Sequence, residues 1–287
     1  MRFGFHVSIA GGFARAVEQA RALKCETIQL FSRNPQGWRL KELDPEDIAK
    51  FKQGIKALDI CPVAVHMPYL PNPAAENREL YEKSIEALAV DLDRASRIGA
   101  QFVVMHMGRR REASEADALE RMATAINRAL QIADCRMPMV ACPKLLLENT
   151  AGMGKSLGDR FEHLKAVIEG VDNPNRLGVV LDTAHVFEAG YDIGTKDGLN
   201  RTLKEFDAVV GLKRLHLLHL NDSRTDLGSR VDRHWHIGKG EIGLEGFRRI
   251  VNHPLLHHLP GIMETPKDSA RADRTNMRII RGLNRQE

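Results

Sequence analysis

The chain has 287 residues, and its 43% hydrophobic and 28% charged side chains are typical of a globular protein with a sizeable core. The formal net charge of +4 permits an anionic partner such as nucleic acid without requiring one, and four cysteines without a CxxC pair argue against a disulfide scaffold. No long apolar stretch follows Arg2, and no apolar run approaches the roughly 20 residues of a membrane span, so we expect a cytoplasmic protein with no signal peptide and no membrane contact.

Short β-rich runs alternate with amphipathic segments in the first half of the chain. Four strand–helix pairs are expected: 2–7 with 13–24, 27–32 with 44–58, 63–67 with 77–98, and 102–108 with 116–133. Asp44 is a suitable N-cap, Pro45 suits the first helical turn, and Gly99 is a natural C-cap.

The same alternation continues in the second half. The expected pairs are 144–152 with 158–170, 177–185 with 197–211, 215–222 with 243–253, and 261–266 with 270–281. Strands that alternate with helices over this length predict an α/β protein, a single (β/α)8 TIM barrel that forms one domain over 1–287.

Metal-ligating side chains close the apolar strands. A His, Asp or Glu ends each of the runs VAVH, FVVMH, KLLLE, GVVLD, LHLLH and GIME. In a barrel the carboxyl ends of parallel strands converge on one rim, where crowded carboxylates and imidazoles need a cation. Together with residues just after two of the strands, the candidate ligands are His66, His106, Glu148, Asp182, His185, His219, Asp232, His234 and Glu264. This set is too large for one zinc ion and suits two or three.

Strand periodicity separates the histidines of LHLLHL. His216 and His219 differ by three positions, so a period of two points them to opposite faces. His219 lies at the strand end and is the expected ligand, and we expect His216 to pack toward the helix layer. We expect His6, which ends the first strand, to support a ligand or to lie in the core.

Two long irregular stretches, 67–76 and 221–241, follow strand ends, where barrel enzymes place their sites. Within the second stretch, Asp232 and His234 fit a simple turn as well as a ligand pair. Asn149 and Asn221 each follow a ligand, and we expect their amides to orient ligands of the site.

Several segments resemble the signature segments of the endonuclease IV family, the metal-dependent apurinic/apyrimidinic endonucleases of DNA base-excision repair. The matching segments are HVSIAGG, NPQGW, VHMPYL, MHMG, LLLENTAG, FEHL, LDTAHVFEAGYD, LLHLNDS and GSRVDRHWHIGKGEIG. The resemblance extends over about residues 3 to 266, and all nine candidate ligands are present. It implies a TIM barrel that holds three zinc ions, with Mn²⁺ or Fe²⁺ as possible replacements in the cell.

The resemblance also implies how the ligands divide. The first ion takes His66, His106 and Glu148; the second shares Glu148 and adds Asp182, His219 and Glu264; the third takes His185, Asp232 and His234. The implied reaction is hydrolysis of the phosphodiester 5′ to an abasic site, which leaves a 3′-hydroxyl and a 5′-deoxyribose phosphate. Glu148 and Glu264 are the expected catalytic residues, which hold or deprotonate the attacking water.

The implied partner is double-stranded DNA with an abasic site, bound by a monomer associated with the nucleoid. An abasic nucleotide is easily flipped out because it has lost its pairing and stacking. Tyr69 and Leu70 match the loop that probes the duplex, and Gln36 stands where family members often carry Arg. Arg230 and Arg233 are expected phosphate contacts.

Two other functions fit part of the pattern. A metal-dependent sugar isomerase or epimerase on the same barrel explains the strand-end ligands and leaves Asp232, His234 and the loop of Tyr69 and Leu70 without a purpose. A DNA-damage binder without catalysis is the third possibility, and the full ligand set argues against it. Metal content separates the first two, since about three zinc ions per chain favours the nuclease and one or two favours the isomerase.

Overall fold

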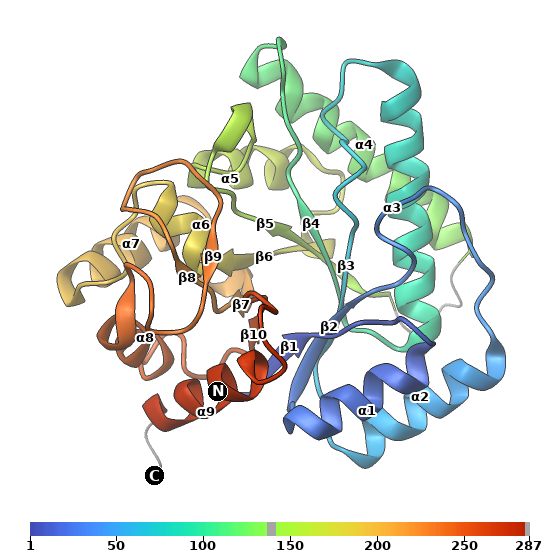
Figure 1. The fold of residues 1–287 in the computed structure, drawn as a ribbon. Helices are drawn as coiled ribbons and strands as arrows, with labels where there is room; N and C mark the ends of the chain where they lie inside the picture. Colours follow the sequence, from blue (N-terminus) through green and yellow to red (C-terminus); the bar gives the residue numbers. More distant parts are fainter. Residues whose placement is uncertain (137–141, 285–287) are drawn as a thin grey trace.

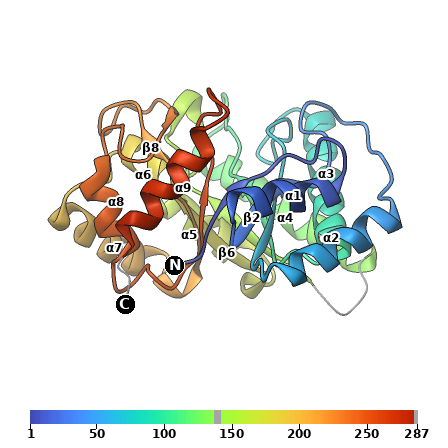
Figure 2. The same cartoon turned by 60° about the horizontal axis from the view of Figure 1, so that its bottom comes forward.

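The chain folds as a closed parallel β-barrel surrounded by helices, as predicted (Figures 1 and 2). The computed structural model describes residues 1–136 and 142–284. The strands follow one another around the barrel in the order β1-β10-β7-β6-β5-β4-β3-β2, and every neighbouring pair is parallel. The barrel strands are β1 (Phe3–His6), β2 (Thr27–Phe31), β3 (Val63–His66), β4 (Phe102–His106), β5 (Lys144–Glu148), β6 (Leu177–Asp182), β7 (Leu215–His219) and β10 (Gly261–Met263).

The helices begin and end near the residues that the sequence indicated. Asp44 caps α2 by accepting from the Glu46 amide at 3.0 Å, and α3 ends at Gly99, whose φ of 79° favours glycine. The α-helices are α1 (Phe13–Leu23), α2 (Pro45–Ala57), α3 (Arg78–Ile98), α4 (Glu115–Arg136), α5 (Phe161–Gly170), α6 (Thr183–Glu188), α7 (Lys196–Val209), α8 (Gly243–Val251) and α9 (Ala272–Leu283).

Several barrel strands end before their predicted ends, as β5 does at Glu148 instead of 152, and two features were not predicted at all. The strand expected over 177–185 ends at Asp182, because the Asp182 carboxylate accepts from the His185 amide at 2.9 Å and starts α6. The stretch expected to be irregular over 221–241 contains a short antiparallel pair, β8 (Asp222–Ser223) and β9 (His234–Trp235). Both differences lie at the carboxyl ends of barrel strands.

The barrel interior determines which strand-end residues meet. Its core is a cluster of fully buried side chains, one from each of β3, β4, β5, β6, β7 and β10: Ala64, Val104, Leu146, Val180, Leu217 and Ile262. Each lies two positions before a candidate ligand, from His66 through Glu264. Because side chains alternate along a strand, the ligands face the same interior, one layer nearer the carboxyl end.

His216 does not pack toward the helix layer as predicted. The register between β6 and β7 shifts, so that Val179 pairs with Leu215 and Val180 pairs with Leu217. The extra residue breaks the alternation on β7. The His216 ring lies 5.9 Å from the ring of Phe102, which packs against the interior cluster from the amino end of β4. His216 is therefore remote from the carboxyl-end rim, and the expected ligand role of His219 does not depend on strict alternation.

Within the described residues no helix has the length and hydropathy needed to cross a membrane. All four cysteines are free, and Cys25 alone among them is buried.

Candidate metal centre

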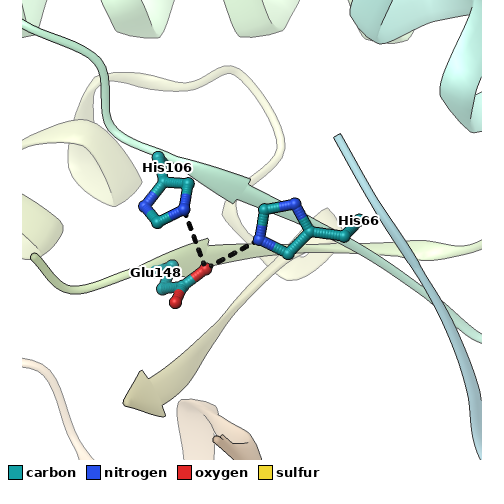
Figure 3. A group of neighbouring side chains, drawn as sticks. All are labelled: His66, His106 and Glu148. Carbon is teal, nitrogen blue, oxygen red and sulfur yellow. Dashed lines mark hydrogen bonds and ion pairs between the residues drawn. The ribbon is translucent and has the colours of Figure 1, made fainter. Parts of the chain in front are cut away.

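The first ligand group joins three neighbouring strands. His66 ends β3, His106 ends β4 and Glu148 ends β5. Both Nε2 atoms face the same carboxylate oxygen, Glu148 Oε2, at 3.1 Å from His66 and 3.7 Å from His106 (Figure 3). His66 and Glu148 are fully buried, and His106 is partly open. The three side chains thus present a compact set of nitrogen and oxygen donors suited to zinc.

The second group shares Glu148 with the first. His219 Nδ1 lies 3.0 Å from Glu148 Oε1, 3.7 Å from Asp182 Oδ2 and 3.4 Å from Glu264 Oε2. Three carboxylates around one imidazole repel one another in a buried site unless positive charge lies among them. Glu148 therefore connects two groups through its two oxygens, as a bridging ligand would.

The third group lies beside the second and includes the loop residues that were ambiguous in the sequence. His185 Nε2 and His234 Nε2 are 3.2 Å apart, and His234 Nε2 is 3.6 Å from Asp182 Oδ2. Asp232 Oδ1 lies 3.5 Å from His185 Nε2 and 3.7 Å from His234 Nε2. Asp232 and His234 thus converge on the rim, which a simple turn would not require. Asp182 contributes to this group as well as to the second.

Hydrogen bonds from the histidine rings to backbone carbonyls indicate which ring nitrogen is free to bind a metal ion. A carbonyl oxygen only accepts, so a histidine nitrogen beside one carries the proton. His66 Nδ1 lies 2.6 Å from the Met67 carbonyl, and His185 Nδ1 lies 3.0 Å from the Asn149 carbonyl. Their Nε2 lone pairs therefore point at Glu148 and at His234. In a neutral ring, a lone pair that faces a carboxylate or a second imidazole nitrogen is repelled unless a proton or a cation lies between them. A bound metal ion would supply that positive charge while both rings stay neutral.

Side-chain amides position the ligands from behind. The Asn149 and Asn221 amides do orient Asp182: Asn149 Oδ1 accepts from the Asp182 amide at 2.7 Å, and Asn221 Nδ2 donates to Asp182 Oδ2 at 2.6 Å. Asn221 also accepts from the Glu264 amide at 2.7 Å. His6 Nδ1 lies 3.0 Å from Glu264 Oε1.

Gln29 is a contributor that the sequence reasoning missed. Its Nε2 donates to Glu264 Oε1 at 2.6 Å, and its Oε1 accepts from His219 Nε2 at 2.9 Å. In the neutral ring this contact assigns the proton to Nε2 and leaves Nδ1, which faces the carboxylates, as the nitrogen that could bind a metal. The signal was a lone amide in the otherwise apolar strand TIQLF, where it is fully buried.

Burial and charge act on the ligands in opposite directions. Burial lowers the pKa of His106 to about 4, which keeps the ring neutral and able to bind a metal at neutral pH. Burial also opposes a charge on His219, yet Glu264 and Glu148 raise its pKa to about 9. Burial would raise the pKa of Asp232, but the hydrogen bond and charge of His185 lower it to about 2. The carboxylates remain ionised and attract cations.

A cavity of about 330 Å³ opens on the centre. His106, His185 and Asp232 lie in its wall together with Tyr69 and Leu70. The centre is therefore reachable from the carboxyl-end face of the barrel.

Comparison with known proteins places this chain among relatives over its whole length. A family model described as a xylose isomerase-like TIM barrel matches residues 17–283. A probable endonuclease 4 of Methanoculleus marisnigri is 47% identical over 280 residues, which are 98% of each chain. The chain belongs to the endonuclease IV family.

Solved structures agree with this assignment. The crystal structure of endonuclease IV from Thermus thermophilus matches with a TM-score of 0.87 and 41% identity, over 99% of this chain and 98% of that one. A D-tagatose 3-epimerase-like protein matches with a TM-score of 0.74 at 18% identity, over 99% of this chain and 97% of that one, which shows a common fold alone. The family assignment therefore rests on endonuclease IV proteins, and the epimerases are distant relatives of the barrel.

The residues that the endonuclease IV resemblance suggested as DNA contacts lie in different surroundings. Tyr69 is 70% exposed and its ring lies 5.4 Å from that of His106, so it stands over the candidate ligands, next to the exposed Leu70. Gln36 is exposed on the loop after β2 and does not line the cavity. Arg230 pairs with Asp159, and the exposed Arg233 donates to the Asp232 carbonyl at 3.2 Å.

Proposed function

We propose that this member of the endonuclease IV family cleaves double-stranded DNA on the 5′ side of abasic sites. The observation that carries the proposal is the trio of overlapping ligand groups at one end of the barrel, joined through Glu148 and Asp182. Clustered divalent ions suit phosphoryl transfer because they stabilise both the attacking and the leaving oxygen. The full-length likeness to endonuclease 4 proteins of 40–47% identity supports the same reaction.

We assign three zinc ions to the centre, with ligands divided as the resemblance implies. Imidazole and carboxylate donors suit zinc, and Mn²⁺ or Fe²⁺ also accept them. The described residues supply every ligand from one chain, which supports a monomer as the active unit.

The bound metals would lower the pKa of the attacking water and neutralise charge on the phosphate. The water oxygen bonds to phosphorus as the bond to the 3′-oxygen of the upstream nucleotide breaks. The ionised Glu264 accepts a proton from the water, and the leaving 3′-oxygen gains one from solvent. Glu148 holds the water in line, and Tyr69 and Leu70 enter the duplex where the abasic nucleotide leaves it.

A nicking assay on an oligonucleotide with one defined abasic site tests the proposal. Protein of measured metal content should cut 5′ to the site, and chelated protein should not. Glu264→Gln should lower kcat roughly 100- to 10,000-fold because it removes a proton acceptor. Glu205→Gln is the matched control, since Glu205 is an exposed carboxylate on α7. Equal nicking by chelated protein would contradict metal-dependent cleavage, and binding without nicking would favour a damage binder.

A further inference from the structure

Three consecutive arginines, residues 109–111, follow β4 and lie outside the segments that resemble endonuclease IV. Arg109 and Arg111 are exposed and line the same cavity as Tyr69, His106 and Asp232. The cavity thus has a cationic side beside the residues that face the proposed scissile bond.

The backbone of this segment is fixed from two sides. On one side, Asn72 accepts from the Arg109 amide at 3.1 Å and donates to the Arg109 carbonyl at 3.0 Å. On the other side, the Arg110 amide donates to the Lys155 carbonyl at 3.2 Å, and the backbones of Arg109 and Ser156 form an isolated antiparallel β-bridge. Arg111 has a φ of 51°, a left-handed conformation that is rare for a long side chain. The loop therefore holds its arginines in place relative to the loop of Tyr69 and Leu70.

The neighbouring Lys and Arg side chains form ion pairs with carboxylates, whereas those of Arg109 and Arg111 do not. Lys155 pairs with Glu112 at 3.1 Å, and Arg160 pairs with Glu115. Arg230, an expected phosphate contact, pairs with Asp159. Within 1–136 and 142–284, neither Arg109 nor Arg111 has a side-chain hydrogen bond or ion pair with another residue. A guanidinium presents a planar set of donors that matches a phosphate.

We propose that Arg109 and Arg111 form a subsite for a backbone phosphate of the DNA strand, next to the phosphate that enters the metal centre. This inference rests on the proposed function for the identity of the ligand. The subsite positions the duplex and carries no base or damage specificity, because phosphate contacts are independent of sequence. It binds ground state and transition state alike, so it acts on KM and not on kcat.

The salt dependence of DNA binding tests the subsite. Affinity for an undamaged duplex is measured between about 50 and 200 mM salt for wild type, Arg109→Ala, Arg111→Ala and the double variant. Each lost phosphate contact should reduce the slope of log affinity against log salt by about 0.9. At low salt the double variant should bind about tenfold more weakly. Its KM for the abasic duplex should rise with kcat retained.

Lys213→Ala is the matched control, since it removes one exposed charge just before β7, at the opposite end of the barrel. Its slope should equal that of the wild type, and all variants should share one melting temperature. An unchanged slope in the double variant, or an equal loss in Lys213→Ala, overturns the subsite. If the wild type binds the abasic duplex without nicking it, the proposed function fails and the salt slopes still decide the subsite. If it binds no duplex at low salt, both fail.

Discussion

At the scale of single residues, Gln29 shows how one neutral side chain determines a metal site. Its amide group donates to Glu264 and its oxygen accepts from His219, so it fixes both ligands at once. Without it, His219 would be free to turn its other nitrogen toward the carboxylates. Losing a partner of this kind typically costs about 10- to 100-fold in metal affinity or activity.

Replacing Gln29 by Leu should weaken zinc binding or nicking by about 10- to 100-fold, because both hydrogen bonds are lost while the volume is similar. Competition with a chelating dye measures the affinity, and kcat is measured on the abasic duplex. Gln53→Leu, on the exposed side of α2, serves as the control. Wild-type zinc affinity in Gln29→Leu would show that Gln29 is only a packing residue.

At the scale of elements, the loop between β8 and β9 depends on a buried carboxylate in α6. Glu188 Oε1 accepts from the Ser223 hydroxyl at 2.8 Å and from the Arg233 amide at 3.1 Å, and its carbonyl accepts from the Arg230 amide at 2.9 Å. Glu188 is fully buried, and its Oε2 has no hydrogen-bond partner among the described residues. This arrangement places Asp232 and His234 over the barrel. A buried Glu with an unpaired oxygen is costly when ionised.

Burial raises the pKa of Glu188 to about 7. In the unfolded chain the Glu188 carboxyl loses its proton near pH 4.5, and in the folded chain it keeps the proton until about pH 7. The stability that the protonated Glu188 contributes is therefore fully present below pH 4.5 and is lost as the pH rises toward 7. We therefore expect Glu188→Gln, which stays neutral, to gain stability relative to the wild type between pH 5 and 7, by on the order of 3 kcal/mol. Urea unfolding of the chelated proteins at several pH values measures the difference. A difference that does not change with pH would contradict the raised pKa.

At the scale of the whole molecule, barrel closure brings distant parts of the chain to one centre. β1 pairs with β10, so His6 meets Glu264 across almost the entire chain. The candidate ligands come from the ends of six barrel strands, from α6 after β6 and from the segment that follows β7. We propose that the chain folds as one unit, because only the closed barrel brings His6 of β1 and Gln29 of β2 into contact with Glu264.

Metal removal should therefore destabilise the whole barrel in one transition. A metal ion that binds only the folded state stabilises that state by about 4 kcal/mol when its concentration is a thousandfold above Kd. Chelation should lower the midpoint of urea unfolding, circular dichroism and tryptophan fluorescence should report the same midpoint, and added zinc should restore it. Two separate transitions would contradict a single folding unit, and a midpoint indifferent to chelation would contradict a cation holding the ligands together.

Much of the fold was predictable because its signals are local. Alternating apolar strands and capped helices such as α2 and α3 appear in the sequence with the right type and order. Predictions failed where tertiary contacts override local pattern. The bulge at His216 arises from pairing with β6, and β6 ends early because the Asp182 carboxylate caps α6, a helix that was not predicted. Neither contact leaves a mark in a single strand's hydrophobic pattern.

The sequence by itself determined the barrel and the candidate ligands, because period-two strands that end in His, Asp or Glu specify both a face and an end of the barrel. The family followed from the resemblance of its motif segments to endonuclease IV. Only the tertiary structure decided which ligands share an oxygen, that Gln29 and Glu188 support them, and that the side chains of Arg109 and Arg111 have no hydrogen bond or ion pair among the described residues. These properties depend on distances between strands and loops that are far apart in the chain, and such distances are set only when the barrel closes.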